Sequence, residues 1–323
     1  MKKSVCMVFG LLAAICTVSA VAQPGYPVRT IRLINPYAPG GGSDAIARRF
    51  AQELTGRLGQ SVVMENIGGA GGIVGMRQVA DAAPDGYTLA FGLTAQFAVN
   101  PSLFPKLPYD SLKSFEPVSL LASAAYVLLV HPSVSASSLP EFIALVKNQP
   151  GKLEYASSGN GSGAHLATEL LKTMAGIDLL HVPYKGAGPA FPDLLSGRVP
   201  VMFSTYAPVA GHLQAGKLRA LGVSTQKRIA VLPNVPAIAE LVPTYESPVW
   251  YMVAAPAGTP KTIITRLNLE FLNALQVPAL RQQFEADGMV LIGTSPDEAR
   301  EFLRREITKW AHVVKASGAR VDQ

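Results

Sequence analysis

The sequence is poor in cysteine, and its two cysteines, Cys6 and Cys16, both lie within the first sixteen of its 323 residues. The rest of the chain therefore has no thiol that could form a disulfide framework, hold a metal through thiolates or act as a nucleophile. Such a chain must be held by an ordinary hydrophobic core. About 300 residues suffice to build one, usually as two domains.

Charged residues are also scarce, at 15% of the chain, and the formal net charge of +6 reflects few acidic residues rather than many basic ones. Lys and Arg form no run longer than pairs such as Arg48-Arg49 and Arg304-Arg305, which are typical of solvated helix faces. No basic stripe is interleaved with aromatic residues, so we expect no nucleic-acid partner. The mild positive charge does favour a small anionic ligand.

Motifs of common catalytic and cofactor chemistry are missing as well. The chain has no Gly-Lys-Ser/Thr and so no Walker A loop. Neither Ser43 nor Ser162 fits the hydrolase elbow G-x-S-x-G, because Ala45 stands two residues after Ser43 and Asn160 two residues before Ser162. The five histidines form no H-x-x-x-H pair and have no clustered carboxylates, so zinc is not expected. We therefore expect no metal and no cofactor.

One weak match to a cofactor motif remains. The stretch GNGSGA (159–164) fits the dinucleotide-binding pattern G-x-G-x-x-A, and Asp178 follows at the distance expected for a ribose-binding acid. No catalytic set accompanies it. An exported enzyme that depends on a nucleotide cofactor is therefore the less favoured alternative.

The first 22 residues have the pattern of a secretory signal peptide. Lys2 and Lys3 form a positive region, Val5 to Val18 is apolar, and Ala20-Val21-Ala22 supplies small residues for cleavage before Gln23. A retained anchor or lipidation at Cys16 is a less favoured alternative. No later stretch is long and apolar enough to span a bilayer, so we predict an exported, soluble protein.

Strand-like and helix-like segments then alternate, which indicates an α/β fold. A β-branched run at 30–37 precedes a helical pattern at 43–59, for which Ser43 is the predicted N-cap. The apolar run 120–133 and the stretch 247–260 are suited to strands that cross between domains. We predict a discontinuous domain of residues 24–122 plus 250–323, with a second domain, 123–249, inserted.

Each predicted domain contains a glycine-rich loop between a strand and a helix, at 39–44 and at 157–163. The first turn of a helix has backbone N–H groups without intrahelical partners, and glycine lets an anion approach them. Because ligands bind beyond the carboxyl ends of strands in open α/β sheets, the two loops are predicted to face one cleft. The alternative is that these glycines only form turns.

Two further positions beside these loops are open to two interpretations. His165 lies one turn into the second helix and either lines the cleft or packs there. Lys185, between Tyr184 and Gly186, is a lone cation among glycines and prolines, and the alternative is an ordinary solvated lysine.

Several ordered motifs resemble the substrate-binding receptors of tripartite tricarboxylate transporters, the Bug family. They include PYAPGGGSDAIARRFAQELTGRLGQSVVMENIGGAGG, AAPDGYTLAFG, NPSLFPKLPYD, YASSGNGSGAHLA, HVPYKGAGPA and AGKLRALGVS, and they run through nearly the whole chain after residue 23. The resemblance implies a two-lobed, type II periplasmic binding protein that closes on one small carboxylate. It implies a receptor without enzymatic activity, working as a monomer with membrane permease subunits.

The resemblance also implies where the ligand binds. The loops that match the family's pocket contain Tyr37, Ala38, Gly41, Gly42, Ser43, Asp44, Thr94, Ala95, Gln96, Ser157, Ser158, Gly161, Ser162, His165, Tyr184, Lys185 and Gly186, with Ser204 nearby.

This chain departs from the family pattern at the predicted pocket. Ser204 stands where many relatives have Asp, and Gln96 and Phe97 add an amide and bulk after the 87–94 strand. Without a carboxylate at 204, an ammonium group on the ligand would have no counter-charge. We therefore predict a carboxylate without an amino group, with an apolar or aromatic body against Tyr37 and Phe97. A sensor that presents its closed form to a signalling kinase is the alternative role.

Overall fold

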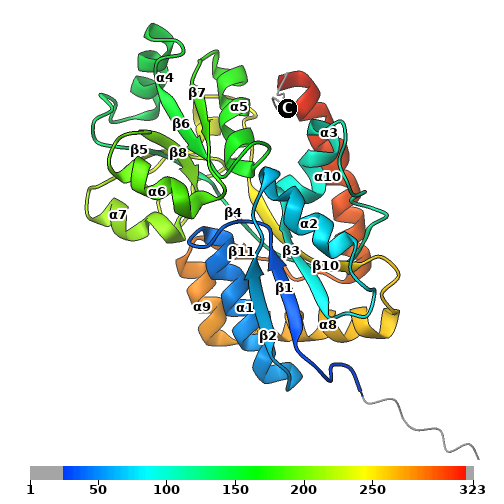
Figure 1. Cartoon of the computed structure of the whole chain (residues 1–323). Helices are drawn as coiled ribbons and strands as arrows, with labels where there is room; N and C mark the ends of the chain where they lie inside the picture. Colours follow the sequence, from blue (N-terminus) through cyan, green and yellow to red (C-terminus); the bar gives the residue numbers. More distant parts are fainter. Residues whose placement is uncertain (1–24, 318–323) are drawn as a thin grey trace, which may run out of the picture.

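The computed structural model describes residues 25–317, so the predicted signal peptide lies outside the described residues. These residues form two α/β lobes, each built around its own sheet (Figure 1). The predicted fold class is therefore confirmed. Among the described residues, no helix is both long and apolar enough to cross a membrane.

Lobe 1 is built around a six-stranded sheet with the order β11-β4-β10-β3-β1-β2. Its strands are β1 (Ile31–Asn35), β2 (Val62–Asn66), β3 (Thr88–Leu93), β4 (Phe115–Ala124), β10 (Val249–Pro256) and β11 (Met289–Leu291). Its helices are α1 (Gly42–Leu58), α2 (Ile73–Ala80), α3 (Asn100–Leu103), α8 (Lys261–Leu275), α9 (Pro278–Ala286) and α10 (Pro296–Ser317). Because β1 pairs in parallel with β2 and β3, the carboxyl ends of these three strands lie at one edge of the sheet.

Lobe 2 is built around a five-stranded sheet with the order β7-β6-β8-β5-β9. Its strands are β5 (Val127–Val130), β6 (Glu154–Ser157), β7 (Leu180–Pro183), β8 (Val201–Ser204) and β9 (Arg219–Val223). Its helices are α4 (Leu139–Asn148), α5 (Gly163–Ala175), α6 (Ala187–Leu195) and α7 (Ala210–Gln214). The parallel pairs of β6 with β7 and β8 again place strand ends together.

The chain passes between the lobes at two adjacent points. The apolar run predicted as one crossing strand forms two strands, since β4 ends at Ala124 in lobe 1 and β5 begins at Val127 in lobe 2. The return enters β10, where Val249 pairs with Ala124 in antiparallel register. The two connections therefore lie side by side, which is the arrangement that a hinge between two lobes requires.

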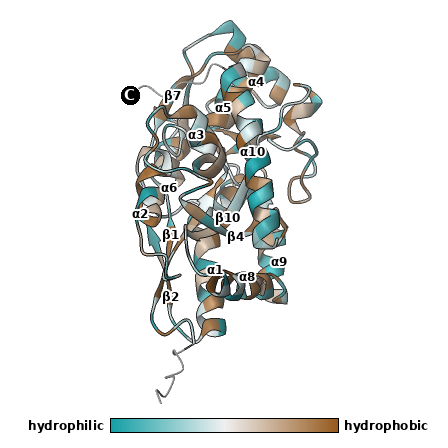
Figure 2. Cartoon of the chain, turned by 90° about the vertical axis from the view of Figure 1, so that its right-hand side faces the viewer, coloured by the Kyte–Doolittle hydropathy of each residue, from teal (hydrophilic) through white to brown (hydrophobic). Residues whose placement is uncertain are grey.

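Helices cover both faces of the sheet in lobe 1. Phe50 of α1 lies 5.7 Å from the ring of Phe271 in α8 and 5.1 Å from that of Phe284 in α9, all three being fully buried. On the other face, α10 buries Leu303 and Trp310. The hydrophilic side of α10 faces outward (Figure 2).

The ends of the two longest helices follow local signals. Ser295 and Glu298 form a capping box at the start of α10, where Glu298 N–H donates to Ser295 Oγ and Ser295 N–H donates to Glu298 Oε2. Helix α1 ends at Gly59, which adopts the left-handed conformation with φ 66°.

Candidate functional site

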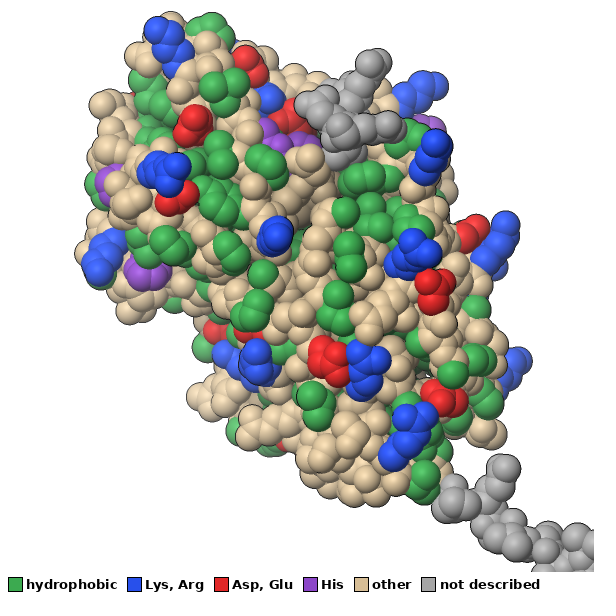
Figure 3. Space-filling model, viewed as in Figure 1, with side chains coloured by type: hydrophobic (Ala, Val, Ile, Leu, Met, Phe, Trp, Pro, Cys, Tyr) green, Lys and Arg blue, Asp and Glu red, His purple; other side chains and the backbone are tan. Residues whose placement is uncertain are grey.

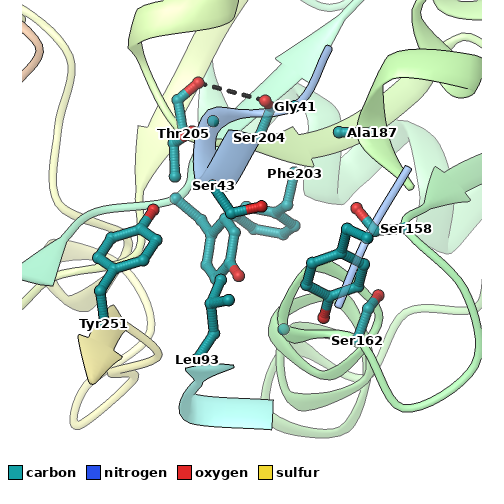
Figure 4. Close-up of a pocket in the computed structure, with 14 residues that line it drawn as sticks. Gly41, Ser43, Leu93, Ser158, Ser162, Ala187, Phe203, Ser204, Thr205 and Tyr251 are labelled. Carbon is teal, nitrogen blue, oxygen red and sulfur yellow. Dashed lines mark hydrogen bonds between the residues drawn. The ribbon is translucent and has the colours of Figure 1, made fainter. Parts of the chain in front are cut away.

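A pocket lies between the lobes, at the carboxyl ends of the strands, and has a cavity volume of about 40 Å³ (Figure 4). This volume is well below the range of about 300–1,000 Å³ that is typical of small-molecule sites, so the two lobes lie close together on it in this structure. Its lining residues are Tyr37, Gly41, Gly42, Ser43, Leu93, Tyr126, Ser158, Ser162, Gly163, Ala187, Phe203, Ser204, Thr205 and Tyr251.

Lobe 1 contributes the start of α1. The N-cap is Gly41 and not Ser43, so the predicted cap was wrong by two positions, and Ser43 lies in the first helical turn. The Asp44 carboxylate accepts a hydrogen bond of 3.1 Å from Gly40 N–H and pairs with Arg48 at 3.3 Å. Asp44 therefore ties the glycine loop to the first turn of α1. Its carboxylate contacts Gly40 N–H and Arg48 and does not line the pocket.

Lobe 2 contributes the start of α5. Ser162 is its N-cap, and its Oγ accepts from His165 N–H at 3.3 Å. Gly161 N–H donates to His165 Nδ1 at 3.1 Å, so this amide is used inside the loop. Ser158 and Ser162 line the pocket on one side, and Ser43 lies between them and Tyr251 (Figure 4).

The lobes touch each other through bare backbone around the pocket. Ala38 N–H of lobe 1 donates to the carbonyl oxygen of Lys185 in lobe 2 at 3.2 Å. A Cβ atom on Gly42 would lie 2.2 Å from Thr205 Oγ1, and one on Gly188 would lie 2.1 Å from the carbonyl oxygen of Pro39. Side chains at these two glycines are therefore incompatible with this approach of the lobes.

The structure brings seven of the residues predicted from sequence together in the pocket. These are Tyr37, Gly41, Gly42, Ser43, Ser158, Ser162 and Ser204. The others lie behind or beside it, namely Ala38, Asp44, Thr94, Ala95, Gln96, Ser157, Gly161, His165, Tyr184, Lys185 and Gly186.

Several of the residues outside the pocket hold the residues that line it. Thr94 Oγ1 accepts from Trp250 N–H at 2.9 Å, next to Tyr251. Ser157 Oγ accepts from Gly159 N–H at 3.1 Å within the second glycine loop. Tyr184 donates to Asp193 at 2.5 Å, and Lys185 beside it lines a neighbouring open groove.

Six residues of the pocket lie outside the loops predicted from the sequence. They are Leu93, Tyr126, Ala187, Phe203, Thr205 and Tyr251, whereas Gly163 is the last residue of the predicted loop 157–163. Ala187 and Thr205 directly follow predicted residues, and their place next to them in the chain is the signal that could have found them. Tyr126 and Tyr251 lie in apolar runs that looked like ordinary crossing strands. The pairing of Tyr251 with Leu93 places Tyr251 at the pocket, and Tyr126 lies where the chain passes from β4 to β5.

Phe97 does not contact the pocket, which corrects the expectation that it would support the body of the ligand. Its side chain is fully buried, stacked 6.3 Å from Trp250 and edge-on to Phe115 at 5.5 Å. The residue belongs to a π-helical turn, Ala95–Val99, that directs Phe97 into the core. The aromatic rings that line the pocket are Tyr37, Tyr126, Phe203 and Tyr251.

The lining of the pocket, which consists of described residues only, includes no Lys, Arg, Asp or Glu side chain. Its polar groups are hydroxyls and the backbone at the starts of α1 and α5. Helix N-termini have unpaired N–H groups and partial positive charge. The pocket can therefore hold an anion through neutral donors, and it offers no counter-charge to an ammonium group.

Behind the second glycine loop, His165 stacks on His181 with ring centroids 4.2 Å apart, and His181 stacks on Tyr155 at 4.8 Å. Burial, with a smaller effect from the nearby Lys172 ammonium, lowers the pKa of His165 to about 4. Burial and the neighbouring His165 lower the pKa of His181 to about 3. Both imidazoles are therefore neutral in the folded protein near pH 7.

The free energy of unfolding should consequently fall as the pH decreases from about 6.5 to about 4. In this window the unfolded chain has its imidazoles protonated while the folded one keeps them neutral, so protons favour unfolding. His165 alone would contribute roughly 3 kcal/mol. Urea unfolding at pH 7 and at pH 4.5 measures the difference. The difference in the free energy of unfolding between the two pH values should be smaller in His165→Gln than in the wild type and unchanged in His212→Gln on α7. The same difference in both variants would contradict the attribution of this pH dependence to His165.

The dinucleotide alternative fails on the position of Asp178. A ribose-binding acid follows the second strand, on the same edge of the sheet as the glycine loop. Asp178 instead precedes β7, at the opposite edge, and lies 3.5 Å from the Lys172 ammonium. The loop 159–164 therefore has no acid placed to hold a ribose.

Two α/β lobes joined by adjacent crossings, with a pocket between them, define a solute-binding protein of the two-lobed kind. Residues 46–319 match the model of the tripartite tricarboxylate transporter family receptor. The chain belongs to this family, whose members are periplasmic binding receptors and not enzymes. The resemblance inferred from the motifs is thus confirmed.

The chain is also similar to individual proteins over nearly its whole length. It is 39% identical to the protein BugT of Bordetella pertussis, covering 97% of both chains. Among solved structures, Rpa4515 of R. palustris with adipate is 35% identical, with a TM-score of 0.88 over 92% of this chain and all of that one. MatC of Rhodopseudomonas palustris with bound malate is 33% identical, with a TM-score of 0.86 over 90% of this chain and all of that one.

Proposed function

We propose that this receptor captures a small organic carboxylate without an amino group in the pocket between its lobes. The observation that carries this proposal is the meeting of two helix starts, one from each lobe, on a pocket whose described lining has no charged side chain. Adipate and malate, held by the two similar structures, are dicarboxylates, which supports the same ligand class.

Neutral donors are sufficient for useful affinity. A hydrogen bond to a charged group contributes about 1.5–3 kcal/mol net. Three or four of them approach the roughly 8 kcal/mol of a micromolar complex. In this proposal the donors come from Gly42 and Ser43 in lobe 1 and from Ser158, Ser162 and Gly163 in lobe 2.

Closure follows from this division of donors. The lobes, which we propose as domains 24–122 plus 250–323 and 123–249, each hold only part of the anion. A ligand that contacts both stabilises the closed state over the open one by its differential affinity. The exported, monomeric receptor would then deliver its ligand to membrane permease subunits.

Addition of adipate or malate should raise the melting temperature of the protein. At a concentration 100 times Kd, a ligand stabilises the fold by about 2.7 kcal/mol, which corresponds to roughly 5 °C for a chain of this size. Thermal-shift and calorimetric titrations with a panel of carboxylates measure this effect. Adipamide, which has the same length and no charge, is the matched control ligand. Tighter binding of glutamate than of the non-amino dicarboxylates would contradict the proposal.

A further inference from the structure

Gln96 is a fully buried amide directly behind the pocket, and its side-chain oxygen and nitrogen both have hydrogen-bond partners. Its Nε2 donates to Tyr37 Oη at 2.7 Å and to the carbonyl oxygen of Gly71 at 2.7 Å. Its Oε1 accepts from Leu93 N–H at 3.1 Å, and its own carbonyl oxygen accepts from Tyr109 at 2.8 Å.

These partners determine which way the side-chain amide points. Leu93 N–H can only donate, so the atom that faces it must be the oxygen. The Gly71 carbonyl can only accept, so the atom that faces it must be the nitrogen. The two constraints agree, and the orientation with Nε2 toward Tyr37 follows from both.

The orientation of the amide decides what Tyr37 can do. Because Gln96 donates to Tyr37 Oη, the tyrosine oxygen is the acceptor in that contact and its own proton must point elsewhere. Tyr37 lines the pocket and is 7% exposed. Burial raises the pKa of Tyr37 to about 12, so the hydroxyl keeps its proton at any physiological pH.

We infer that Tyr37 donates its proton to an oxygen of the bound ligand and that Gln96 is the positioning residue that enforces this direction. The inference rests on the proposed function, because it needs a carboxylate in the pocket. The inference adds a donor that determines specificity. A ligand must place an unprotonated oxygen at Tyr37, because the Tyr37 proton cannot point toward the Gln96 nitrogen that donates to the same hydroxyl oxygen.

The other two tyrosines of the pocket differ in this respect. Among the described residues, no hydrogen-bond partner is found for the hydroxyls of Tyr126 and Tyr251, although both rings line the same space. Each of these hydroxyls can rotate to donate or to accept. Tyr37 is therefore the tyrosine of the pocket with a directed proton.

Calorimetric titration of adipate, malate and succinate into four variants tests the inference. Tyr37→Phe should weaken the tightest of the three complexes about 10- to 100-fold, as expected for one hydrogen bond to a charged group. Gln96→Met should weaken it about 3- to 10-fold. The double variant should bind no more weakly than Tyr37→Phe alone, because Gln96 acts through the Tyr37 hydroxyl.

Tyr245→Phe is the matched control, because its hydroxyl donates to the Ala167 carbonyl inside lobe 2, away from the pocket. It should bind like the wild type. Affinity of Tyr37→Phe within threefold of the wild type would overturn the donor role, and multiplied losses in the double variant would overturn the positioning role.

The design separates this inference from the proposed function on which it rests. Failure of all three acids to bind the wild type would overturn both. Wild-type binding with an unaffected Tyr37→Phe would overturn the inference alone. If Gln96→Met does not fold, the comparison of Tyr37→Phe with Tyr245→Phe still decides whether Tyr37 donates.

Discussion

Gly188→Ala should lower the affinity for the carboxylate about 100-fold while leaving the free protein folded. The added Cβ would lie 2.1 Å from the carbonyl oxygen of Pro39, a backbone atom of the opposite lobe that cannot rotate away. Overpacking of this kind costs about 1–3 kcal/mol, and a backbone clash lies at the upper end. The cost applies only to the closed state, so it appears in the binding free energy.

The matched control is Gly211→Ala, also in a helix of lobe 2, where a Cβ would meet nothing within 4 Å. Neither glycine has a left-handed φ, so alanine fits both helices and should slightly favour them. Titration calorimetry gives the affinities, and small-angle scattering shows whether the ligand still compacts each variant. Binding by Gly188→Ala within threefold of the control would mean that capture does not need this approach of the lobes.

Phe50→Ala should destabilise the protein by about 3–5 kcal/mol, the range for removing a large aromatic side chain from a core. Phe50 is fully buried and lies within 6.2 Å of the rings of Phe91, Phe271 and Phe284. Its loss would leave a cavity between α1 and its two neighbouring helices. Because the pocket uses the first turn of α1, we also expect weaker ligand binding.

Denaturant unfolding monitored by circular dichroism measures the loss. Gln52→Ala, at an exposed position of the same helix, is the control and should change stability by no more than about 0.5 kcal/mol. A loss below 1 kcal/mol in Phe50→Ala would show that the cluster repacks around the gap, contrary to the expectation for a tightly packed core.

The scattered charge of the surface suits a protein that binds through its cleft. On the face shown in Figure 3, Lys and Arg side chains lie singly or beside acidic ones and form no continuous stripe. Arg32 with Glu65 and Arg228 with Glu240 are examples of such pairs, each at 2.7 Å. Exposed ion pairs of this kind contribute little to the free energy of unfolding, so the hydrophobic core must supply most of it.

Most of the local structure could be predicted from the sequence. The capping box of Ser295 and Glu298, the helix end at Gly59 and the glycine loops before α1 and α5 all depend on a few neighbouring residues. The error of two positions at the start of α1 has a local cause too: Asp44 caps Gly40 N–H, and this allows the helix to begin at Gly42 without Ser43 as its cap.

The pocket could be predicted only in part. The loops were recognisable because glycine and serine before a helix have a clear physical meaning. Phe97 was misplaced because a π-helical turn after β3 changes the direction in which its side chain points. Gln96 was expected as part of the pocket, whereas the structure shows it as the support of Tyr37 and Gly71.

The sequence by itself determined the α/β alternation, the bare backbone at two helix starts and the absence of thiol chemistry after residue 16, because each depends on composition or on short spacings. Only the tertiary structure decided that Tyr126, Phe203 and Tyr251 share one space with Tyr37. Their positions depend on strand pairing and on two lobes meeting, and such contacts join residues far apart in the chain.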